Sequence, residues 1–339
     1  MNRENKAYAK FALSREMMET AGIIERFNFS RAPEAEKAIG QRKKVFFTGE
    51  GSSRIFPAKQ FIYQALRRRA GLHAATDGSR QAAEYDLSDF AVFAASNSGQ
   101  TKEVVHLLRD LKARGHAALF SLSAFADTPL GQASTVAYVL SCGKEGATAA
   151  TKSVVEQTLF YHAILDRVTG ANALPRRAKE LAEKFSRALS LTIPPAIIQK
   201  LTAADVIHWS GRNTGAAEEL TLKTNEITRK RSAYLEGTYA VHGIEEVMSR
   251  KDAVIVLDPF EAEEEKFEEV LVKGVGLTVV AIASRDTRFP TIRVPSADAL
   301  DHYVHLAAGW NLLVEIGLAL GVNLDKAERA RKVGNVLVE

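Results

Sequence analysis

Four residues in one stretch of the chain have the types and spacing that proton-transfer chemistry needs. Glu219, Lys223 and Glu226 lie three or four positions apart, so an α-helix would carry them on one face. His242 follows sixteen positions after Glu226, in a segment expected to be a turn or a short strand. Two carboxylates, an ammonium group and an imidazole can move a proton to and from carbon. The alternative for the helix is a salt-bridged face exposed to solvent.

Two turns rich in glycine and hydroxyl side chains form a second group. The apolar run 45–47 leads into a turn with Gly49, Gly51, Ser52 and Ser53, and the run 90–95 leads into Ser96, Asn97, Ser98, Gly99, Gln100 and Thr101. A helix-like segment follows each turn. Free N–H groups and the positive end of a helix dipole favour an anion there, and hydroxyl groups add donors. The alternative is that these residues are ordinary helix N-caps. Neither turn has a nucleotide-binding fingerprint, so no nucleotide cofactor is expected.

The elements that must position these residues alternate between strand and helix. Strands are predicted near 45–47, 90–95, 117–122 and 136–140, and in the second half near 206–209, 253–257 and 277–282. Helices are predicted near 8–27, 102–114, 149–168, 216–228, 261–273 and 300–320. Alternating elements predict parallel sheets covered on both faces. The fold class is therefore α/β, with two doubly wound, flavodoxin-like domains in tandem. The pattern breaks near 169–175, which places the domains at 1–175 and 176–339.

The two halves share the order strand, glycine turn, helix, which indicates a weak internal duplication. They differ in the loops that follow their strands. The second-half loop Asp258–Glu261 is acidic and has no set of hydroxyl groups. A phosphate site is therefore expected in the first half only.

Composition narrows the function classes further. The chain has 339 residues, a formal net charge of +4 and one cysteine, Cys142. The small charge and short basic runs do not predict a nucleic-acid partner, and no stretch approaches the roughly 20 apolar residues of a membrane span. One cysteine excludes an intramolecular disulfide and a cysteine-based metal cluster. No signal-peptide pattern begins the chain, so we expect a cytoplasmic protein with no metal and no cofactor.

With these residues in view, the chain resembles the tandem sugar isomerase (SIS) domain family. It is similar to the isomerase half of glucosamine-6-phosphate synthase and to stand-alone phosphosugar isomerases and deaminases. The resemblance depends on the turns at 49–53 and 96–101, on Ala150–Lys152, on the helix with Glu219, Lys223 and Glu226, and on His242-Gly243. It covers nearly the whole chain from about residue 45.

The resemblance implies a role for each matching residue. Glu226 would be the base that moves a proton between C1 and C2, His242 would assist ring opening from the neighbouring subunit of a homodimer, and Lys223 and Glu219 would support the base. Lys332 matches a lysine in the family's C-terminal tail. The sugar phosphate would be held by Gly51, Ser52, Ser53, Ser96, Asn97, Ser98, Thr101 and Ala150.

The sequence departs from the family pattern at several of these positions. Asn97 replaces a glutamine, Ala150 replaces a serine, and Ile244 replaces the proline that usually follows the His-Gly pair. The resemblance implies an aldose–ketose isomerase for an amino- or amine-substituted hexose 6-phosphate, with or without deamination. The alternatives are a phosphosugar-binding sensor without turnover, a fructosamine-6-phosphate-type deglycase, and an isomerase of a sugar without nitrogen.

Overall fold

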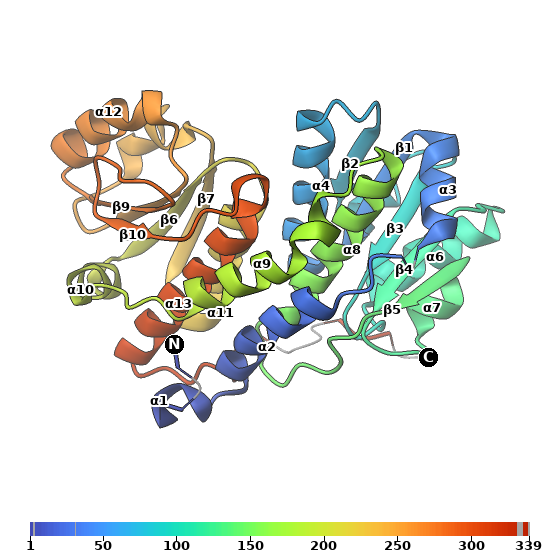
Figure 1. The fold of residues 1–339 in the computed structure, drawn as a ribbon, viewed down its shortest axis with the longest axis horizontal. Helices are drawn as coiled ribbons and strands as arrows, with labels where there is room; N and C mark the ends of the chain where they lie inside the picture. Colours follow the sequence, from blue (N-terminus) through green and yellow to red (C-terminus); the bar gives the residue numbers. More distant parts are fainter. Residues whose placement is uncertain (3, 31, 331–334, 338–339) are drawn as a thin grey trace. The chain divides into compact units, whose positions relative to one another are not determined.

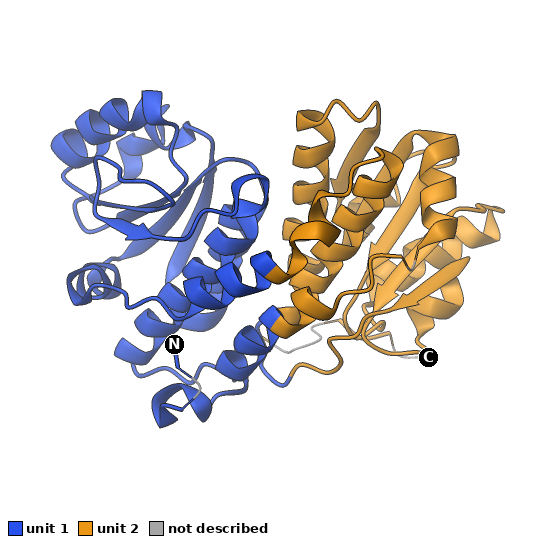
Figure 2. Cartoon of the chain, viewed as in Figure 1, with its two compact units in different colours: residues 1–21, 146–149, 180–328 blue, residues 22–145, 150–179, 329–339 orange. Residues whose placement is uncertain are grey.

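A computed structural model describes residues 1–2, 4–30, 32–330 and 335–337. The chain forms two compact units, each of which combines separate stretches of the sequence (Figure 2). Unit 1 contains residues 1–21, 146–149 and 180–328, and unit 2 contains residues 22–145, 150–179 and 329–339. The helices α2 (Ala12–Arg26) and α9 (Ala173–Leu189) each continue from one unit into the other. The domain division at residue 175 stays a prediction.

Unit 2 is built on a parallel sheet of five strands in the order β2-β1-β3-β4-β5. The strands are β1 (Lys44–Gly49), β2 (His73–Asp77), β3 (Ala91–Ala95), β4 (Leu119–Ser123) and β5 (Val136–Val139). Every residue of β3 and β4 is buried, which explains why β3 is a continuous apolar run and why β4 is apolar except at Ser121 and Ser123.

Helices cover both faces of this sheet (Figure 1). On one face, β1 and β3 place Phe47 and Phe93 against Phe61 and Tyr161 of α4 (Ile55–Arg67) and α8 (Lys152–Val168), and α3 (Pro33–Arg42) packs beside α8. On the other face, Phe46, Val92 and Ala94 form a buried cluster with α5 (Ser79–Ala82), α6 (Lys102–Ala113) and α7 (Pro129–Ala133). Alternate strand residues therefore serve opposite faces, as a pleated sheet requires.

Unit 1 repeats this arrangement with a second parallel sheet, in the order β10-β9-β8-β6-β7. Its strands are β6 (Val206–Gly211), β7 (Arg231–Glu236), β8 (Ala253–Leu257), β9 (Thr278–Ala283) and β10 (Thr291–Arg293). Counted from the first strand of each sheet, both have the flavodoxin-like order 2-1-3-4-5. The predicted fold class and the internal duplication are confirmed.

The helices of unit 1 also form two layers. The helix α11 (Ala216–Thr228) packs against α13 (Asp301–Ala319), with α10 (Pro195–Ala203) beside α13. The other layer is one continuous segment: a 3-10 turn (Glu261–Glu263), α12 (Glu264–Phe267) and a π-helix (Glu268–Val275). The single acidic helix predicted at 261–273 is thus three kinds of helix in succession. Phe267 and Leu271 of this segment pack on Val254 and Val256 of β8.

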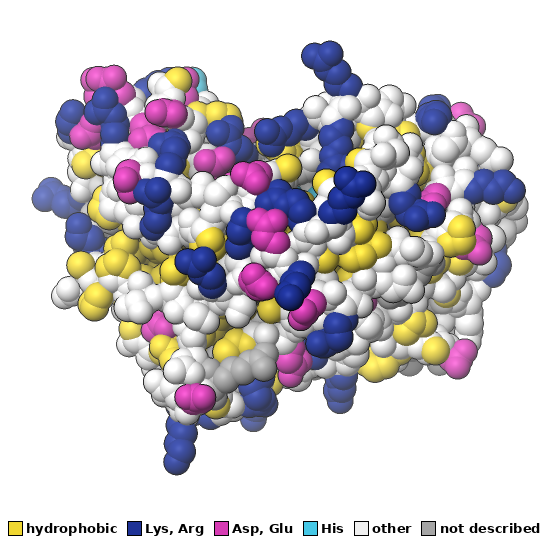
Figure 3. Space-filling model, in the orientation of Figure 1, with side chains coloured by type: hydrophobic (Ala, Val, Ile, Leu, Met, Phe, Trp, Pro, Cys, Tyr) yellow, Lys and Arg dark blue, Asp and Glu magenta, His cyan; other side chains and the backbone are white. Residues whose placement is uncertain are grey.

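No helix in the described ranges combines the length and the apolarity needed to span a membrane. The face drawn in Figure 3 has basic and acidic side chains interspersed over both units. That mixture is typical of a solvated protein surface.

Candidate functional site

The two hydroxyl-bearing turns leave neighbouring strands of the sheet of unit 2 at the same edge. Gly49 and Ala95, the last residues of β1 and β3, are register partners in the parallel sheet. Gly49 is followed by the 3-10 turn Gly51–Ser53, and Ala95 is followed by Ser96. From β1 the chain goes to β2 on one side of β1, and from β2 it crosses to β3 on the other side, which makes this edge the topological switch point of the sheet. Ligands of open α/β sheets bind at such a point.

The turn after β3 gathers three hydroxyl groups. Ser96 Oγ lies 2.8 Å from Thr101 Oγ1 and 3.4 Å from Ser98 Oγ. Thr101 is the N-cap residue of α6, yet its side chain makes no hydrogen bond to the amides of the helix. The hydroxyl that would cap the helix is instead directed to Ser96. The helix-cap alternative for this turn is therefore wrong for Thr101.

The backbone of the turn needs glycine at position 99. Gly99 has φ +64°, a conformation that other residues rarely adopt. A Cβ atom there would lie 2.4 Å from Cβ of Thr128, the N-cap residue of α7. The turn thus closes tightly on the start of α7, and Leu130 donates its N–H to the Gly99 carbonyl at 3.1 Å.

Asn97 is held by a residue that the sequence analysis did not single out. Its Nδ2 donates to the Glu145 carboxylate at 3.1 Å, and Glu145 also accepts from the N–H of Thr151 at 2.8 Å and from Ser153 Oγ at 2.8 Å. Ala150, half-buried, directly precedes Thr151. The structure therefore joins the 96–101 turn to the Ala150–Lys152 segment through one buried carboxylate.

The C-terminal tail lies on the same turn. Lys102 N–H donates to the Asn335 carbonyl and Leu337 N–H donates to the Gln100 carbonyl, each at 3.0 Å. Thr101 and Val336 form an antiparallel bridge, and Leu337 packs against the apolar cluster under α6. Lys332, assigned to the tail in the sequence analysis, lies outside the described residues.

The predicted carboxylate–lysine group is on α11 in unit 1. Lys223 Nζ lies 2.6 Å from Glu226 Oε2 and 3.3 Å from Glu219 Oε1. The side chains of Lys223 and Glu219 are 0% exposed, whereas that of Glu226 is 26% exposed. A solvated salt-bridged face is therefore the wrong interpretation of this spacing, because two of the three charges are inside the protein.

Burial and charge act in opposite directions on Lys223. Burial alone lowers the pKa of its ammonium group, but the nearby Glu226 and Glu219 carboxylates outweigh this effect and the net pKa is raised. Lys223 therefore stays charged near neutral pH. It holds Glu226 in position, and the partly exposed Glu226 is the member of the group that a ligand can reach.

His242 follows the 3-10 turn Tyr239–Val241 and is exposed. Within the described part of the chain, its imidazole makes no hydrogen bond or ion pair with Glu219, Lys223 or Glu226. The structure thus brings three of the predicted catalytic residues together on α11, and His242 belongs to a separate segment, after the 3-10 turn.

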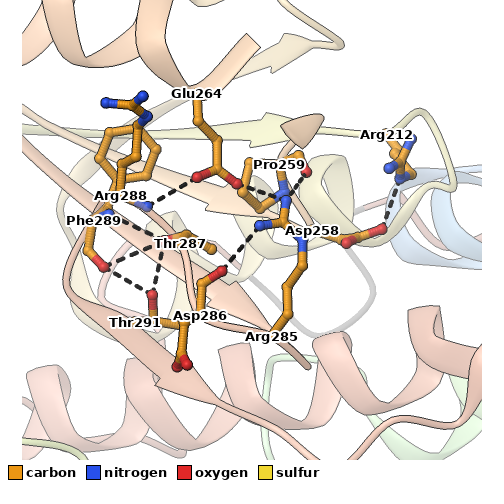
Figure 4. Close-up of polar contacts among 10 residues, drawn as sticks. All are labelled: Arg212, Asp258, Pro259, Glu264, Arg285, Asp286, Thr287, Arg288, Phe289 and Thr291. Atoms are coloured by element: carbon orange, nitrogen blue, oxygen red, sulfur yellow. Dashed lines mark hydrogen bonds and ion pairs between the residues drawn. The ribbon is translucent and has the colours of Figure 1, made fainter. Parts of the chain in front are cut away.

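The equivalent edge of the sheet in unit 1 has a different chemistry (Figure 4). Arg212, which follows β6, forms an ion pair with Asp258, which follows β8, at 2.7 Å. Arg285, which follows β9, pairs with Glu264 at 2.6 Å and donates to the Pro259 carbonyl at 2.7 Å. In the acidic loop after Leu257, Asp258 is therefore paired with Arg212, while Arg285 joins the Pro259 carbonyl of the loop to Glu264 of α12. The phosphate-site asymmetry between the halves stays a prediction.

Among the described residues, no three or more His, Cys, Asp or Glu side chains form a group that could hold a metal ion. Four of the eight histidines are buried: His162, His208, His302 and His305. Burial lowers the pKa of His162 and of His305 to about 4.

The part of the chain that carries both hydroxyl-bearing turns matches a known protein family. Residues 38–167, which include both hydroxyl turns, match the family model of the SIS domain. The resemblance to the SIS family is thus confirmed for this part of the chain. No curated protein sequence matches the chain.

Solved structures extend the likeness over the whole chain. The C-terminal domain of glucosamine-fructose-6-phosphate aminotransferase from Francisella tularensis aligns with a TM-score of 0.80 at 15% identity, covering 95% of this chain and 100% of that one. Glucosamine-6-phosphate deaminase from Thermotoga maritima aligns with a TM-score of 0.76 at 21% identity, covering 96% and 100%. Tagatose-6-phosphate ketose/aldose isomerase from Escherichia coli aligns with a TM-score of 0.77 at 16% identity, covering 99% and 98%. At these identities the likeness shows the fold.

Proposed function

We propose that this protein is a phosphosugar aldose–ketose isomerase. The observation that carries the proposal is the hydroxyl cluster of Ser96, Ser98 and Thr101, which lies at the switch point of a SIS domain and does not cap α6. Uncharged donors beside a helix N-terminus suit the phosphate group of a sugar. We assign the phosphate to this cluster together with Gly51, Ser52, Ser53 and Asn97, and we assign Ala150 to the substrate-binding set.

The reaction requires a base that removes a proton beside a carbonyl group and returns it one carbon along. We assign this role to Glu226, since it is the exposed end of a buried ion group. Lys223, charged and buried, positions the Glu226 carboxylate, and Glu219 holds Lys223 from the other side. His242 is proposed to assist ring opening and Lys332 to act from the tail. Both assignments come from the family resemblance.

The substrate is proposed to be an amino- or amine-substituted hexose 6-phosphate, with or without release of the amine. The names of the relatives by fold support a hexose 6-phosphate, because they include fructose-6-phosphate and tagatose-6-phosphate, and glucosamine-6-phosphate among them supports an amino sugar. We further propose a cytoplasmic homodimer whose subunits share their active sites through His242. Full activity of a strictly monomeric protein in sedimentation would contradict the shared site.

Thermal unfolding against a panel of phosphosugars tests the proposal. A ligand of the native state present at 100 times its Kd adds about 2.7 kcal/mol to the free energy of unfolding. Glu226→Gln should keep that stabilisation while the conversion rate falls by about 10²–10⁴-fold, the usual contribution of a general base. The matched control is Glu183→Gln, the same exchange at an exposed position of α9 in the same unit.

The outcomes separate the alternatives. Binding with unchanged turnover in Glu226→Gln would refute the assigned base. Binding without any turnover by the unmodified protein would make it a phosphosugar sensor. Release of an amine or an amino acid along with conversion would make it a deaminase or a deglycase. If no phosphosugar raises the unfolding midpoint, the hydroxyl cluster has no phosphate role and the proposal fails.

A further inference from the structure

Glu145 lies in the loop between β5 and α8 of unit 2 and is almost fully buried, with 3% of its surface exposed. A buried carboxylate is costly unless donors surround it. Here donors come from two segments of the chain. Asn97 supplies its side-chain amide, and Thr151 and Ser153, at the start of α8, supply backbone N–H and hydroxyl groups.

We infer that Glu145 is a positioning residue that presets the 96–101 turn for the sugar phosphate by holding the Asn97 side chain. The inference rests on the proposed function, and it adds a residue to which no role has been assigned. Glu145 itself would not touch the substrate. It would act through Asn97 on the geometry of the turn.

The contacts of Asn97 explain why one carboxylate can preset the turn. Its backbone carbonyl accepts the N–H of Ala124 at 2.9 Å, which ties the turn to the end of β4. Its Nδ2 donates to Glu145, and its Oδ1 accepts a long contact of 4.0 Å from Cys142 Sγ. Burial raises the pKa of the Cys142 thiol, which therefore stays protonated and can donate. Both ends of the Asn97 amide group are thus engaged, and Glu145 provides the charge-assisted contact.

An aligned turn needs no rearrangement when the anion arrives, because its N–H and hydroxyl groups are already in place. This preorganisation reduces the ordering cost of binding. Without Glu145 the Asn97 side chain would keep only its long contact with Cys142, and this part of the turn would be ordered only as the ligand binds. The expected effect is on affinity, and therefore on KM, with kcat little changed.

A second buried carboxylate of the same domain provides a matched control. Glu156 is 0% exposed and accepts from Ser141 N–H at 2.7 Å, Ser141 Oγ at 2.8 Å and Cys142 N–H at 2.7 Å. It resembles Glu145 in burial and in the kinds of donors it collects, but its donors belong to the loop after β5. Loss of either carboxylate should reduce stability. Only loss of Glu145 should weaken anion binding.

The test measures the dissociation constant of inorganic phosphate and of fructose 6-phosphate by calorimetry, with unfolding midpoints recorded in parallel. Glu145→Gln should raise both dissociation constants about tenfold or more, in proportion to the loss of a hydrogen bond to a charged group. Glu156→Gln should change them less than about twofold while it also lowers the midpoint. Glu145→Asp, which keeps the charge on a shorter side chain, serves where Glu145→Gln fails to fold, and should give an intermediate loss of affinity.

A double-mutant cycle separates the positioning role from general destabilisation. In the Asn97→Ala background, Glu145→Gln should have almost no further effect on phosphate affinity, because the link is already broken. The inference is overturned if neither Glu145 variant changes affinity, if Glu156→Gln changes it as much, or if the effect of Glu145→Gln persists in the Asn97→Ala background. If the unmodified protein binds neither phosphate nor fructose 6-phosphate, the proposed function and the inference both fail.

Discussion

The buried ion group on α11 makes a quantitative prediction for Lys223→Met. Methionine has nearly the shape of lysine but no charge, so Glu219 and Glu226 lose a counterion that lies 3.3 Å and 2.6 Å away. Removing one partner of a buried ion pair costs about 3–5 kcal/mol, because the charge left behind stays desolvated. Glu219, at 0% exposure, is the residue that bears this cost. We expect the free energy of unfolding to fall by that amount in urea titrations followed by circular dichroism.

The matched control is Lys184→Met on α9, where Lys184 pairs with Glu180 at the same four-residue spacing but both side chains reach solvent. Such exposed pairs contribute about 0–1 kcal/mol. Adding Glu219→Gln to Lys223→Met should restore most of the lost stability. Equal losses for the two lysine variants, with no rescue by Glu219→Gln, would refute the reasoning.

Two further predictions concern unit 2. Burial lowers the pKa of His162 to about 4, and Arg68 Nη2 donates to its Nε2 at 2.7 Å. In the unfolded chain His162 therefore binds a proton as pH falls below about 6.5, whereas in the folded protein it stays neutral down to about pH 4. The free energy of unfolding should accordingly fall by about 3 kcal/mol between pH 6.5 and 4. His162→Gln should flatten this part of the profile in acid titrations of stability, and an unchanged slope would contradict the assignment. Leu337→Asp should detach the tail from the turn, because an aspartate cannot pack on the apolar cluster that Leu337 contacts. Hydrogen exchange of the Lys102 amide, which donates to Asn335, should then accelerate about tenfold or more, and an unchanged rate would show that the tail is held by other contacts.

Much of the fold could be predicted from the sequence because its central strands are buried on both faces. The strands β3 and β8 are continuous apolar runs, and β4 and β9 are largely apolar. Their short length and the turn residues that follow them indicate buried strands. The elements that escaped prediction are short or lie at sheet edges. They include β2, which is only partly buried, and β10, which has three residues. Neither shows a clear apolar pattern, since their pairing partners, and not their own residues, determine that they are strands.

The sequence alone determined which residues could do chemistry. The spacing of Glu219, Lys223 and Glu226 placed them on one helix face, and the run of Ser96, Ser98 and Thr101 placed three hydroxyls in one turn. These are local properties, because helical periodicity and turn composition depend on residues a few positions apart. The burial of this helix face depends on segments far away in the chain, so the sequence left open whether the face is exposed to solvent or buried.

Only the tertiary structure decided the environment of those residues. It buried Lys223 between two carboxylates because α11 packs under α13, more than 70 residues later in the chain. It turned the Thr101 hydroxyl toward Ser96 and laid Asn335–Leu337 along the turn from the far end of the sequence. It also brought Glu145 to Asn97 across 48 positions. Burial, charge compensation and preorganisation arise from contacts between distant segments, and a local pattern does not encode them.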